Sequence, residues 1–255
     1  MKKLLCLAAL ALAGCATPFI DTSYTATGQE SRARFVVIHY THEDFPTSLK
    51  ILTERKASAH YLVRDDPPIV YRLVDENRAA WHAGVSSWRG HTYLNFTSIG
   101  IEIVYIGQGD EPTGPNWNEY PPAQIDAVVK LVKEIVARHQ IPPENVVGHG
   151  ETAPQRKIDP GPRFPWKRLA DEGLIRWPSA AEVARRVPGF EAQLPDALWF
   201  QDNLARHGYA VPQNGVLDPA TRRVLLNFQM KYRPSRYDGT PDAETAALLD
   251  VLVRP

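Results

Sequence analysis

Apolar positions along the first two thirds of the chain predict alternating strands and helices. Two segments predict buried strands, because a strand covered on both faces lacks polar alternation: the β-branched and aromatic residues 35–40, and residues 98–105, which are apolar on both faces except for Glu102. Two shorter segments of the same kind, 59–63 and 69–74, flank a proline-containing turn and predict two more strands. Between residues 121 and 142, apolar side chains recur every three or four positions, which predicts a helix with one apolar face.

Weaker patterns predict the remaining elements of this region. We expect a helix at 46–56, a short strand at 145–148 and the start of a helix at 163–169. Residues 148–162 contain three Gly and three Pro, so we expect a loop there and not a helix or a strand. The aromatic-rich segment 80–90 is also expected to be a loop.

The composition changes after residue 170, which indicates a second domain. The pattern G-x-x-D-x-x-T occurs twice, 24 residues apart, starting at Gly215 and at Gly239. Each copy precedes an apolar segment, and Asp is a preferred residue at the start of a helix. The repeat therefore predicts a small all-helical domain at 192–255, connected by a linker at 171–191.

The N-terminus has the features of a targeting segment. Two lysines precede an apolar stretch at 4–12, which is too short to cross a bilayer but suits a signal segment. Residues 12–15 read Leu-Ala-Gly-Cys, which resembles the lipobox of bacterial lipoproteins. We therefore expect a signal peptide at 1–15, a lipid on Cys15 and a polar tether at 16–33. The alternative is an ordinary secretory signal with an incidental cysteine.

The residue after Cys15 is Ala16. In the lipoprotein sorting rule of Gram-negative bacteria, Asp at this position retains the protein in the inner membrane. Its absence predicts an outer-membrane lipoprotein that faces the periplasm.

Charge and cysteine usage exclude several classes of function. Lys plus Arg and Asp plus Glu each total 29, and no basic block occurs, so nothing indicates nucleic-acid binding. The second cysteine, Cys6, leaves with the signal peptide. The mature domains then have no thiol nucleophile, no cysteine metal ligand and no disulfide.

Three residues form a candidate metal site. His39 ends a predicted strand, His149 follows another, and Asp159 lies ten residues further on. Two imidazoles and one carboxylate suit Zn²⁺ and leave one position for water, as in catalytic zinc sites. Taken singly, each of these residues is more often structural than metal-binding.

Six motifs, in order along the chain, resemble one known family. They lie at residues 37–41, 58–63, 81–84, 98–102, 147–149 and 157–162. Together they resemble the zinc-dependent N-acetylmuramoyl-L-alanine amidases of the type-2 amidase family, over residues 34–170. The resemblance implies an α/β fold with a central, mainly mixed β-sheet flanked by helices, and the layout is that of lipidated outer-membrane members.

The resemblance also implies roles for individual residues. His39, His149 and Asp159 match the family's zinc ligands. Lys157 matches a lysine that stabilises the oxyanion, and Glu102 matches a glutamate that transfers protons. The alternatives are a solvent-facing strand residue for Glu102 and a surface ion pair for Lys157.

Three more residues are candidates for the substrate cleft. His60 occupies the place of a catalytic tyrosine in a phage member of the family, and a structural hydrogen bond is an equal alternative. Trp81 and His82 are expected to line the glycan side of the cleft, with core packing as the alternative.

The C-terminal domain resembles the peptidoglycan-binding domain 1 family, a three-helix module. This implies that it holds the enzyme on the cell wall by raising the local concentration. The alternative is a structural cap that has lost binding.

The sequence therefore predicts a zinc amidase that cleaves the bond between N-acetylmuramic acid and L-alanine of peptidoglycan stem peptides. We expect a monomer that binds peptidoglycan and muropeptides and contacts the membrane through the lipid on Cys15. Two alternatives remain open at this point: a non-catalytic peptidoglycan-binding lipoprotein, and a zinc endopeptidase that acts within the stem peptide.

Overall fold

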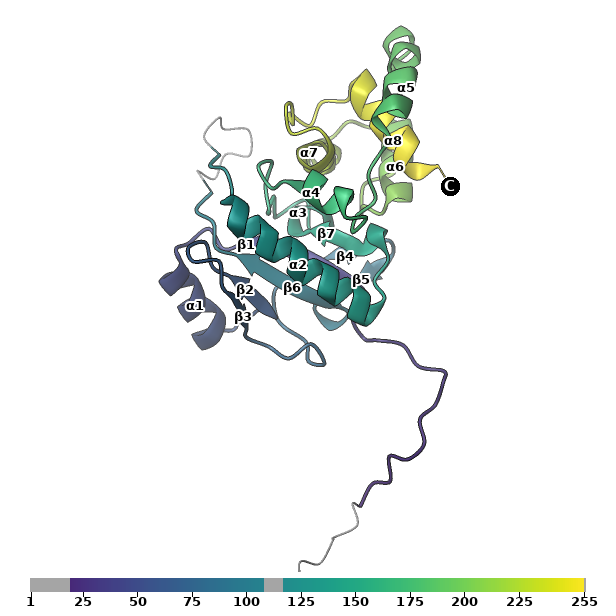
Figure 1. The fold of residues 1–255 in the computed structure, drawn as a ribbon. Coiled ribbons are helices and arrows are strands. Elements are labelled where there is room, and N and C mark those ends of the chain that lie inside the picture. Colours follow the sequence, from purple (N-terminus) through teal and green to yellow (C-terminus); the bar gives the residue numbers. More distant parts are fainter. Residues whose placement is uncertain (1–18, 108–116, 255) are drawn as a thin grey trace, which may run out of the picture. The chain divides into compact units, whose positions relative to one another are not determined.

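The computed structural model describes residues 19–107 and 117–254 (Figure 1). The predicted signal peptide and the candidate lipidation residue Cys15 lie outside the described residues. The chain divides into two units, and the first ends at Glu30. Residues 19–30 are exposed and contain no helix or strand, as expected of a tether. The predicted tether is slightly too long, because Ala33 is buried and the Ser31 hydroxyl lies 2.6 Å from His139 Nδ1 in the second unit.

The second unit contains a five-stranded mixed sheet with the strand order β3-β2-β6-β1-β7. Its strands are β1 (Phe35–Tyr40), β2 (Tyr61–Val63), β3 (Val70–Arg72), β6 (Ser98–Ile103) and β7 (Val146–Gly148). Strand β1 runs parallel to β6 and β7, β2 runs parallel to β6, and β3 is antiparallel to β2. A separate pair is formed by β4 (Ser87–Trp88) and β5 (His91–Thr92). The predicted mixed sheet is confirmed.

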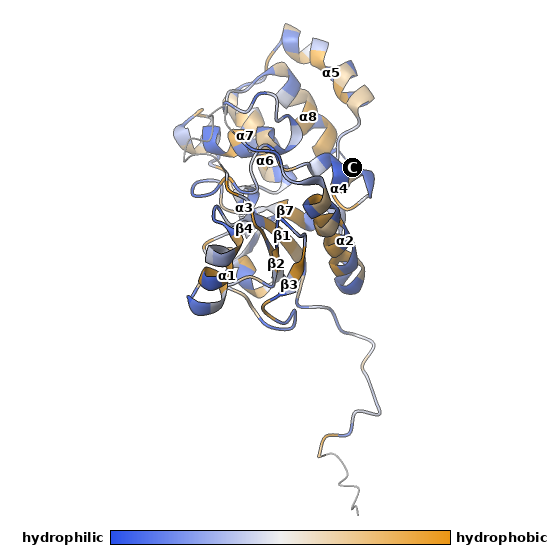
Figure 2. Ribbon diagram, turned by 60° about the vertical axis from the view of Figure 1, so that its left-hand side comes forward, coloured by the Kyte–Doolittle hydropathy of each residue, from blue (hydrophilic) through white to orange (hydrophobic). Residues whose placement is uncertain are grey.

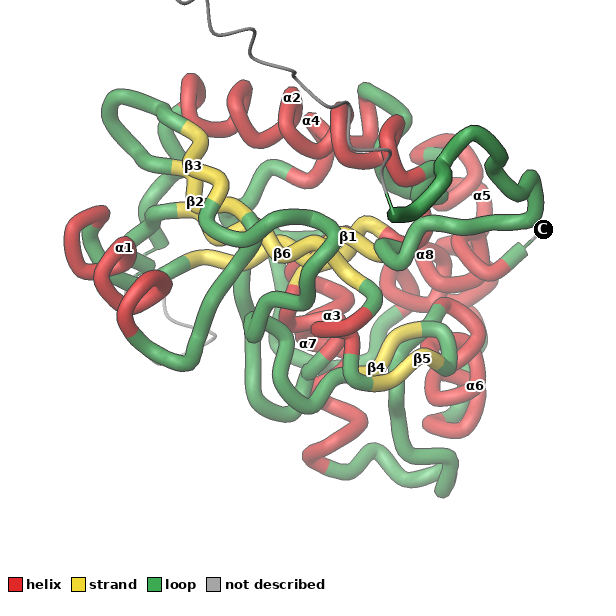
Figure 3. Tube along the Cα trace, turned by 90° about the horizontal axis from the view of Figure 1, so that it is seen from below, coloured by secondary structure: helices red, strands yellow, loops and turns green. Residues whose placement is uncertain are grey.

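Helices lie on both faces of this sheet. The helices in the described ranges are α1 (Phe45–Glu54), α2 (Pro122–His139), α3 (His149–Thr152), α4 (Trp166–Asp171), α5 (Ala180–Ala192), α6 (Ala197–His207), α7 (Pro219–Tyr232) and α8 (Ala243–Val253), with 3₁₀ turns η1 (Leu94–Phe96) and η2 (Pro143–Asn145). Figure 3 shows α2 and α4 on one side of the sheet and α3 and α7 on the other. None of the helices in the described ranges is long and apolar enough to cross a membrane.

Strand β1 divides its side chains between two hydrophobic cores. Val36 and Ile38 belong to the core that includes the apolar face of α2, whereas Phe35 and Val37 belong to the core shared with α6, α7 and α8. Figure 2 shows apolar residues gathered in the sheet and in the helices beside it. Because successive side chains of a strand point to opposite faces, His39 lies on the same face as Phe35 and Val37.

Two segments differ from the sequence predictions. The expected loop at 148–162 contains the one-turn helix α3, which begins at His149. The Glu151 carboxylate stabilises this turn by accepting a hydrogen bond from the Gly148 N–H at 2.7 Å. The expected linker at 171–191 contains most of helix α5, whose Val183 is buried in the core with α8. Pro188 inside α5 obscures the helical pattern in the sequence.

The repeated pattern in the C-terminal domain forms matching helix starts, as predicted. Asp218 caps α7 by accepting from Thr221 N, and Asp242 caps α8 by accepting from Thr245 N. Each threonine hydroxyl also accepts a hydrogen bond from a buried glutamine side chain, Gln201 for Thr221 and Gln229 for Thr245. Helices α6, α7 and α8 therefore form the predicted three-helix module.

Candidate metal centre and active site

Two neighbouring strands bring the candidate ligands together. His39 follows Ile38 on β1, His149 follows Gly148 on β7, and Ile38 and Gly148 are paired in register. Asp159 returns to the same point, because the backbone of Gly150 donates to the Asp159 carbonyl at 2.8 Å. The sheet and the short helix α3 therefore bring together three side chains that are 10 to 120 residues apart in sequence.

The three ligand atoms lie at nearly equal separations. His39 Nδ1 is 3.0 Å from His149 Nδ1, and each of these nitrogens is 3.1 Å from Asp159 Oδ2. All three side chains are buried, and the group can hold a metal ion. Zinc bonds of about 2.0–2.1 Å in tetrahedral geometry place ligand atoms roughly 3.3 Å apart. The observed spacing fits such an ion.

Hydrogen bonds behind the histidines determine which nitrogen faces this centre. The Ser98 hydroxyl donates to the Leu94 carbonyl at 2.5 Å, so its oxygen accepts from His82 Nε2 at 3.1 Å. His82 Nδ1 then accepts from His39 Nε2 at 2.9 Å. His39 Nδ1 consequently carries a lone pair that faces the centre.

His149 is held in the same manner. Its Nε2 donates to the Ala83 carbonyl at 3.1 Å, which leaves Nδ1 as the lone-pair atom. Two imidazole lone pairs and the carboxylate of Asp159 therefore meet with no proton between them. Three mutually repelling electron donors in a buried site call for a cation, and hydrogen-bonded outer partners are typical of metal-binding histidines.

The electrostatic surroundings favour a neutral His39 and an ionised Asp159. Burial, and after it the neighbouring His149, lowers the pKa of His39 to about 4. Burial opposes ionisation of Asp159, but the neighbouring imidazoles of His149 and His39 outweigh it and hold the pKa of Asp159 well below its usual value. These protonation states are the ones that a metal requires of its ligands.

Glu102 lies beside the centre on the adjacent strand. It is paired in register with His39 in the parallel β1–β6 ladder, so the two side chains share one face of the sheet. Its Oε2 atom is buried and has no hydrogen-bond partner among the described residues. Burial and the nearby Asp159 raise the pKa of Glu102 well above its usual value, and Lys157 opposes the shift.

The candidate catalytic residues line one cavity of about 260 Å³. His39, His149 and Asp159 form part of its wall, together with Glu102 and Lys157. Trp81 and His82 also line it, and Trp81 is 46% exposed. The structure thus places seven of the eight predicted metal, catalytic and cleft residues at one site.

His60 is the exception, because it does not line this cavity. It is fully buried, its Nδ1 accepts from the Gly100 N–H at 3.0 Å, and its Nε2 lies 3.0 Å from the Arg78 carbonyl. Both ring nitrogens are therefore used within the fold, and the residue does not line the cavity. The structural alternative accounts for His60.

Sequence reasoning did not identify the residues that orient the histidines. Ser98 and Ala83 lie within two of the family motifs, but only the fold shows that they bind His82 and His149. Gly100 is needed for a similar reason, since a Cβ at this position would lie 2.4 Å from His82 Cγ. The signal in the sequence that could have indicated these contacts is a small residue within each of two family motifs, Ala83 in residues 81–84 and Gly100 in residues 98–102.

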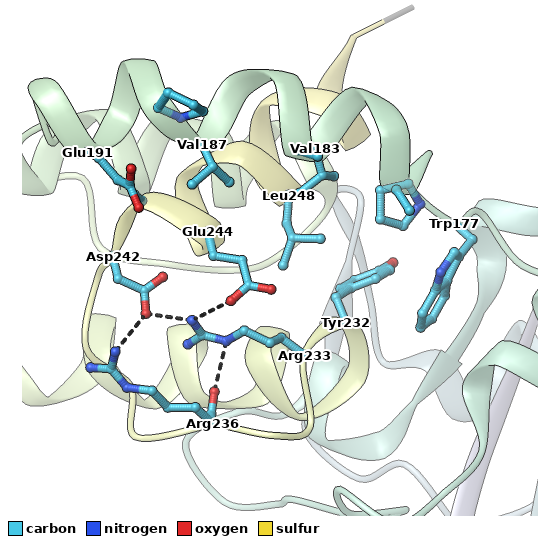
Figure 4. A pocket seen from close by; sticks show the side chains of 15 residues that line it. Trp177, Val183, Val187, Glu191, Tyr232, Arg233, Arg236, Asp242, Glu244 and Leu248 are labelled. Carbon is cyan, nitrogen blue, oxygen red and sulfur yellow. Dashed lines mark hydrogen bonds and ion pairs between the residues drawn. The ribbon is translucent and has the colours of Figure 1, made fainter.

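A larger cavity of about 740 Å³ lies among α5, α7 and α8 (Figure 4). Ion pairs lie on its wall: Arg233 Nη1 lies 2.6 Å from Asp242 Oδ2 and 3.3 Å from Glu244 Oε2. None of the candidate site residues lines this cavity. The smaller cavity, with its convergent titratable groups, is therefore the candidate active site.

The fold and site are those of a metal-dependent hydrolase, and comparison with known proteins identifies the family. The N-acetylmuramoyl-L-alanine amidase family matches residues 29–162, and a peptidoglycan binding domain family matches residues 193–249. The chain belongs to the N-acetylmuramoyl-L-alanine amidase family. It is an amidase with an added peptidoglycan-binding domain.

Individual relatives are similar over nearly the whole chain. N-acetylmuramoyl-L-alanine amidase AmiD of Escherichia coli strain K12 is 43% identical over 262 residues, which cover 96% of this chain and 95% of the relative. A solved structure of Escherichia coli AmiD with a substrate gives a TM-score of 0.82 at 43% identity and covers 92% of this chain and 93% of that one. The solved structure of AmpDh3 from Pseudomonas aeruginosa, in complex with an anhydromuramic pentapeptide, gives a TM-score of 0.85 at 41% identity. The match covers 92% of this chain and 97% of that one.

Proposed function

We propose that this protein is a zinc-dependent amidase that hydrolyses the bond between N-acetylmuramic acid and the L-alanine of peptidoglycan stem peptides. One observation carries the proposal: the three-ligand centre lines the same cavity as Glu102, whose Oε2 atom has no hydrogen-bond partner among the described residues. A protein that only binds peptidoglycan has no need of an open metal position or of a partly buried base beside it. The non-catalytic alternative is therefore disfavoured.

The solved relatives indicate the class of substrate. Escherichia coli AmiD was solved with anhydro-N-acetylmuramic acid-L-Ala-D-γ-Glu-L-Lys, and AmpDh3 with an anhydromuramic pentapeptide. We infer that this chain also takes a muramyl sugar carrying a stem peptide. Trp81, half exposed at the cavity wall and 5.7 Å from the Phe96 ring, offers an aromatic face for the sugar.

His39, His149 and Asp159 would hold the metal, with their ligand atoms already facing one another. Zinc, when bound, would polarise the substrate carbonyl and lower the pKa of water to about 7. The role of the protein is to direct each imidazole Nδ1 toward the centre. The outer hydrogen bonds of the histidines to His82 and to the Ala83 carbonyl serve this purpose.

Glu102 is proposed as the proton carrier. Its carboxylate would take a proton from water as the water oxygen bonds to the lactyl carbonyl carbon. It would then deliver that proton to the alanine nitrogen as the carbon–nitrogen bond breaks. The products are a free lactyl carboxylate on the sugar and a peptide that begins with L-alanine. Burial suits Glu102 to this work, because it raises the pKa of the group that must accept a proton near neutral pH.

Lys157 is proposed to stabilise the developing oxyanion. It lines the cavity with Glu102, and its position two residues before Asp159 ties its backbone to the metal centre. A positive charge aimed at the point where negative charge develops lowers the barrier to acyl transfer.

We also propose that the protein acts at the cell envelope. The Leu-Ala-Gly-Cys motif at residues 12–15 supports a lipid on Cys15, and the peptidoglycan-binding domain supports a periplasmic site of action. We expect a monomeric outer-membrane lipoprotein, in which the exposed tether connects the lipid on Cys15 to the catalytic unit. A Cys15→Ala variant should leave the membrane fraction and fail to incorporate labelled fatty acid. Retention of this variant in the outer membrane would contradict the anchor.

Product analysis tests the reaction itself. Incubation with a defined muropeptide should release a peptide that begins with L-alanine and a muramyl sugar that keeps its lactyl group with a free carboxylate. Mass spectrometry distinguishes these products from those of an endopeptidase, which would leave at least L-alanine on the sugar. Sugars that retain L-alanine would overturn the amidase mechanism in favour of the endopeptidase alternative.

A further inference from the structure

One face of helix α7, in the C-terminal domain, contacts the segment that carries His149. Arg223, Asn227 and Lys231 are spaced four residues apart, so they lie along one side of the helix. Arg223 Nε donates to the Pro154 carbonyl at 3.2 Å, and Lys231 binds Glu151. Figure 3 shows α3 and α7 side by side beneath the sheet. The module is therefore in direct contact with the segment that supplies two of the three proposed metal ligands.

The contact between Lys231 and Glu151 is a buried ion pair. Lys231 Nζ lies 3.0 Å from Glu151 Oε1 and 2.9 Å from Oε2, and the side chains are 5% and 4% exposed. The ammonium also lies 4.2 Å from the centre of the Trp166 ring. Such a pair is strongly constrained, because removing one partner leaves an uncompensated charge in the interior.

Glu151 transmits this constraint to the backbone around His149. Its Oε2 accepts from the Gly148 N–H at 2.7 Å, so the carboxylate holds the residue that immediately precedes His149. Glu151 itself lies two residues after His149 in the same helical turn. The ligand is thus fixed from both sides by one carboxylate, which is held in turn by Lys231.

The Asn227 side chain on α7 also lies close to the backbone of Gly150, the residue after His149. A Cβ on Gly150 would lie only 2.1 Å from Asn227 Oδ1, so α7 packs directly against the backbone between His149 and Glu151. The N–H of Gly150 binds the carbonyl of Asp159, another proposed ligand. The position of α7 therefore sets the geometry of both His149 and Asp159.

We propose that Lys231 is a positioning residue of the metal centre, so that the peptidoglycan-binding module is also a structural part of the active site. This inference rests on the proposed function, in which His149 binds the metal. It goes beyond that function because it assigns to the module a role that does not depend on wall binding. A module that acted only as a tether would leave the hydrolysis of small soluble substrates unchanged when its contact with α3 was altered.

The test uses the full chain with Lys231→Met, and Arg222→Met as a control on the exposed side of the same helix. Zinc affinity is measured by competition with a chromophoric chelator, and turnover is measured on a soluble anhydromuropeptide. Lys231→Met should bind zinc about 10–100-fold more weakly, as is typical for loss of an outer partner of a metal ligand. Its kcat should fall at saturating substrate with little change in KM, and binding to insoluble murein should remain as in wild type.

A double variant keeps the proposal testable if Lys231→Met does not fold. Glu151→Gln combined with Lys231→Met removes both buried charges, so it carries no unpaired ion. It should still bind zinc at least about tenfold more weakly than wild type, because the contact that orients α3 is gone. Wild-type zinc affinity and soluble turnover in either variant would overturn the proposal. Failure of the wild-type protein to bind zinc would instead overturn the proposed function on which it rests.

Discussion

His39 Nε2 lies 2.9 Å from His82 Nδ1, and this hydrogen bond links the proposed metal centre to the loop after β3. The chain of bonds continues through Ser98 to the Leu94 carbonyl, which fixes the direction in which each proton points. His82, expected from sequence to line the cleft, therefore has a second task. It keeps a lone pair of His39 directed at the centre.

Replacing His82 with Phe should weaken zinc binding by about 10–100-fold, because phenyl cannot accept the His39 N–H. Competition with a chelator of known affinity measures this change. Trp81→Phe is the matched control, since it alters the adjacent side chain without touching a ligand. If zinc affinity in the His82 variant stayed within twofold of wild type, the orienting role would be wrong.

Glu102→Gln should reduce kcat by about 10²–10⁴-fold while zinc still binds, because the amide cannot accept the proton. The raised pKa of Glu102 adds a pH test. The base works deprotonated, so wild-type activity should fall as the pH drops through that raised pKa. Steady-state rates across pH, with the exposed Glu134→Gln as control, check both points. An unchanged acidic limb in the variant would assign that limb to another group.

Lys157→Met should reduce kcat by roughly 10²–10³-fold, which is the usual effect of removing one oxyanion-stabilising group. Zinc content should remain unchanged, since Lys157 is not a ligand. Lys130→Met provides the control, because it removes an exposed lysine from α2. A Lys157 variant with wild-type kcat would indicate that the side chain is directed at solvent.

Glu76→Gln should destabilise the fold by about 1–3 kcal/mol at neutral pH. The carboxylate accepts from Tyr61 at 2.7 Å and from Arg138 at 2.7 and 2.8 Å, and it lies 2.8 Å from His139 Nε2. Burial opposes ionisation, but these partners lower the pKa of Glu76 to about 2. Its contribution is therefore present above the ordinary pKa near 4.5 and is lost as pH falls toward 2.

Urea unfolding at pH 7 and at pH 3 measures this effect. The difference in unfolding free energy between wild type and Glu76→Gln should narrow as the pH is lowered. Glu172→Gln, which breaks the exposed pair with Lys133, should change stability by only about 0–1 kcal/mol. Equal effects of the two substitutions would contradict a special role for the Glu76 cluster.

Local sequence patterns predicted much of the fold. Strands β1 and β6 and helix α2 follow from apolar runs and from a 3.6-residue period, and both capped helices of the module follow from the repeated Asp. The proposed ligands could be selected because strand ends, histidines and an aspartate fell within ordered motifs. Each of these signals lies within a single segment, so it can be recognised without knowledge of tertiary contacts.

The features that sequence missed depend on contacts between distant segments. Helix α3 is one turn long and is held by Glu151 and by α7, so no local propensity marks it. The sequence around Lys231 does not indicate that its side chain is buried, because its partner Glu151 lies 80 residues away. His60 resembled a site residue because its place in a motif does not reveal that both ring nitrogens bind backbone groups.

Metal removal and restoration test the central claim most directly. The wild-type protein and Asp159→Asn are stripped with a chelator, dialysed, and titrated with zinc while amide cleavage of a soluble muropeptide is followed. The account predicts that stripped wild type is inactive, that about one equivalent of zinc per chain restores its activity, and that Asp159→Asn needs far more zinc. Full activity in the stripped wild-type protein would contradict a catalytic metal at His39, His149 and Asp159.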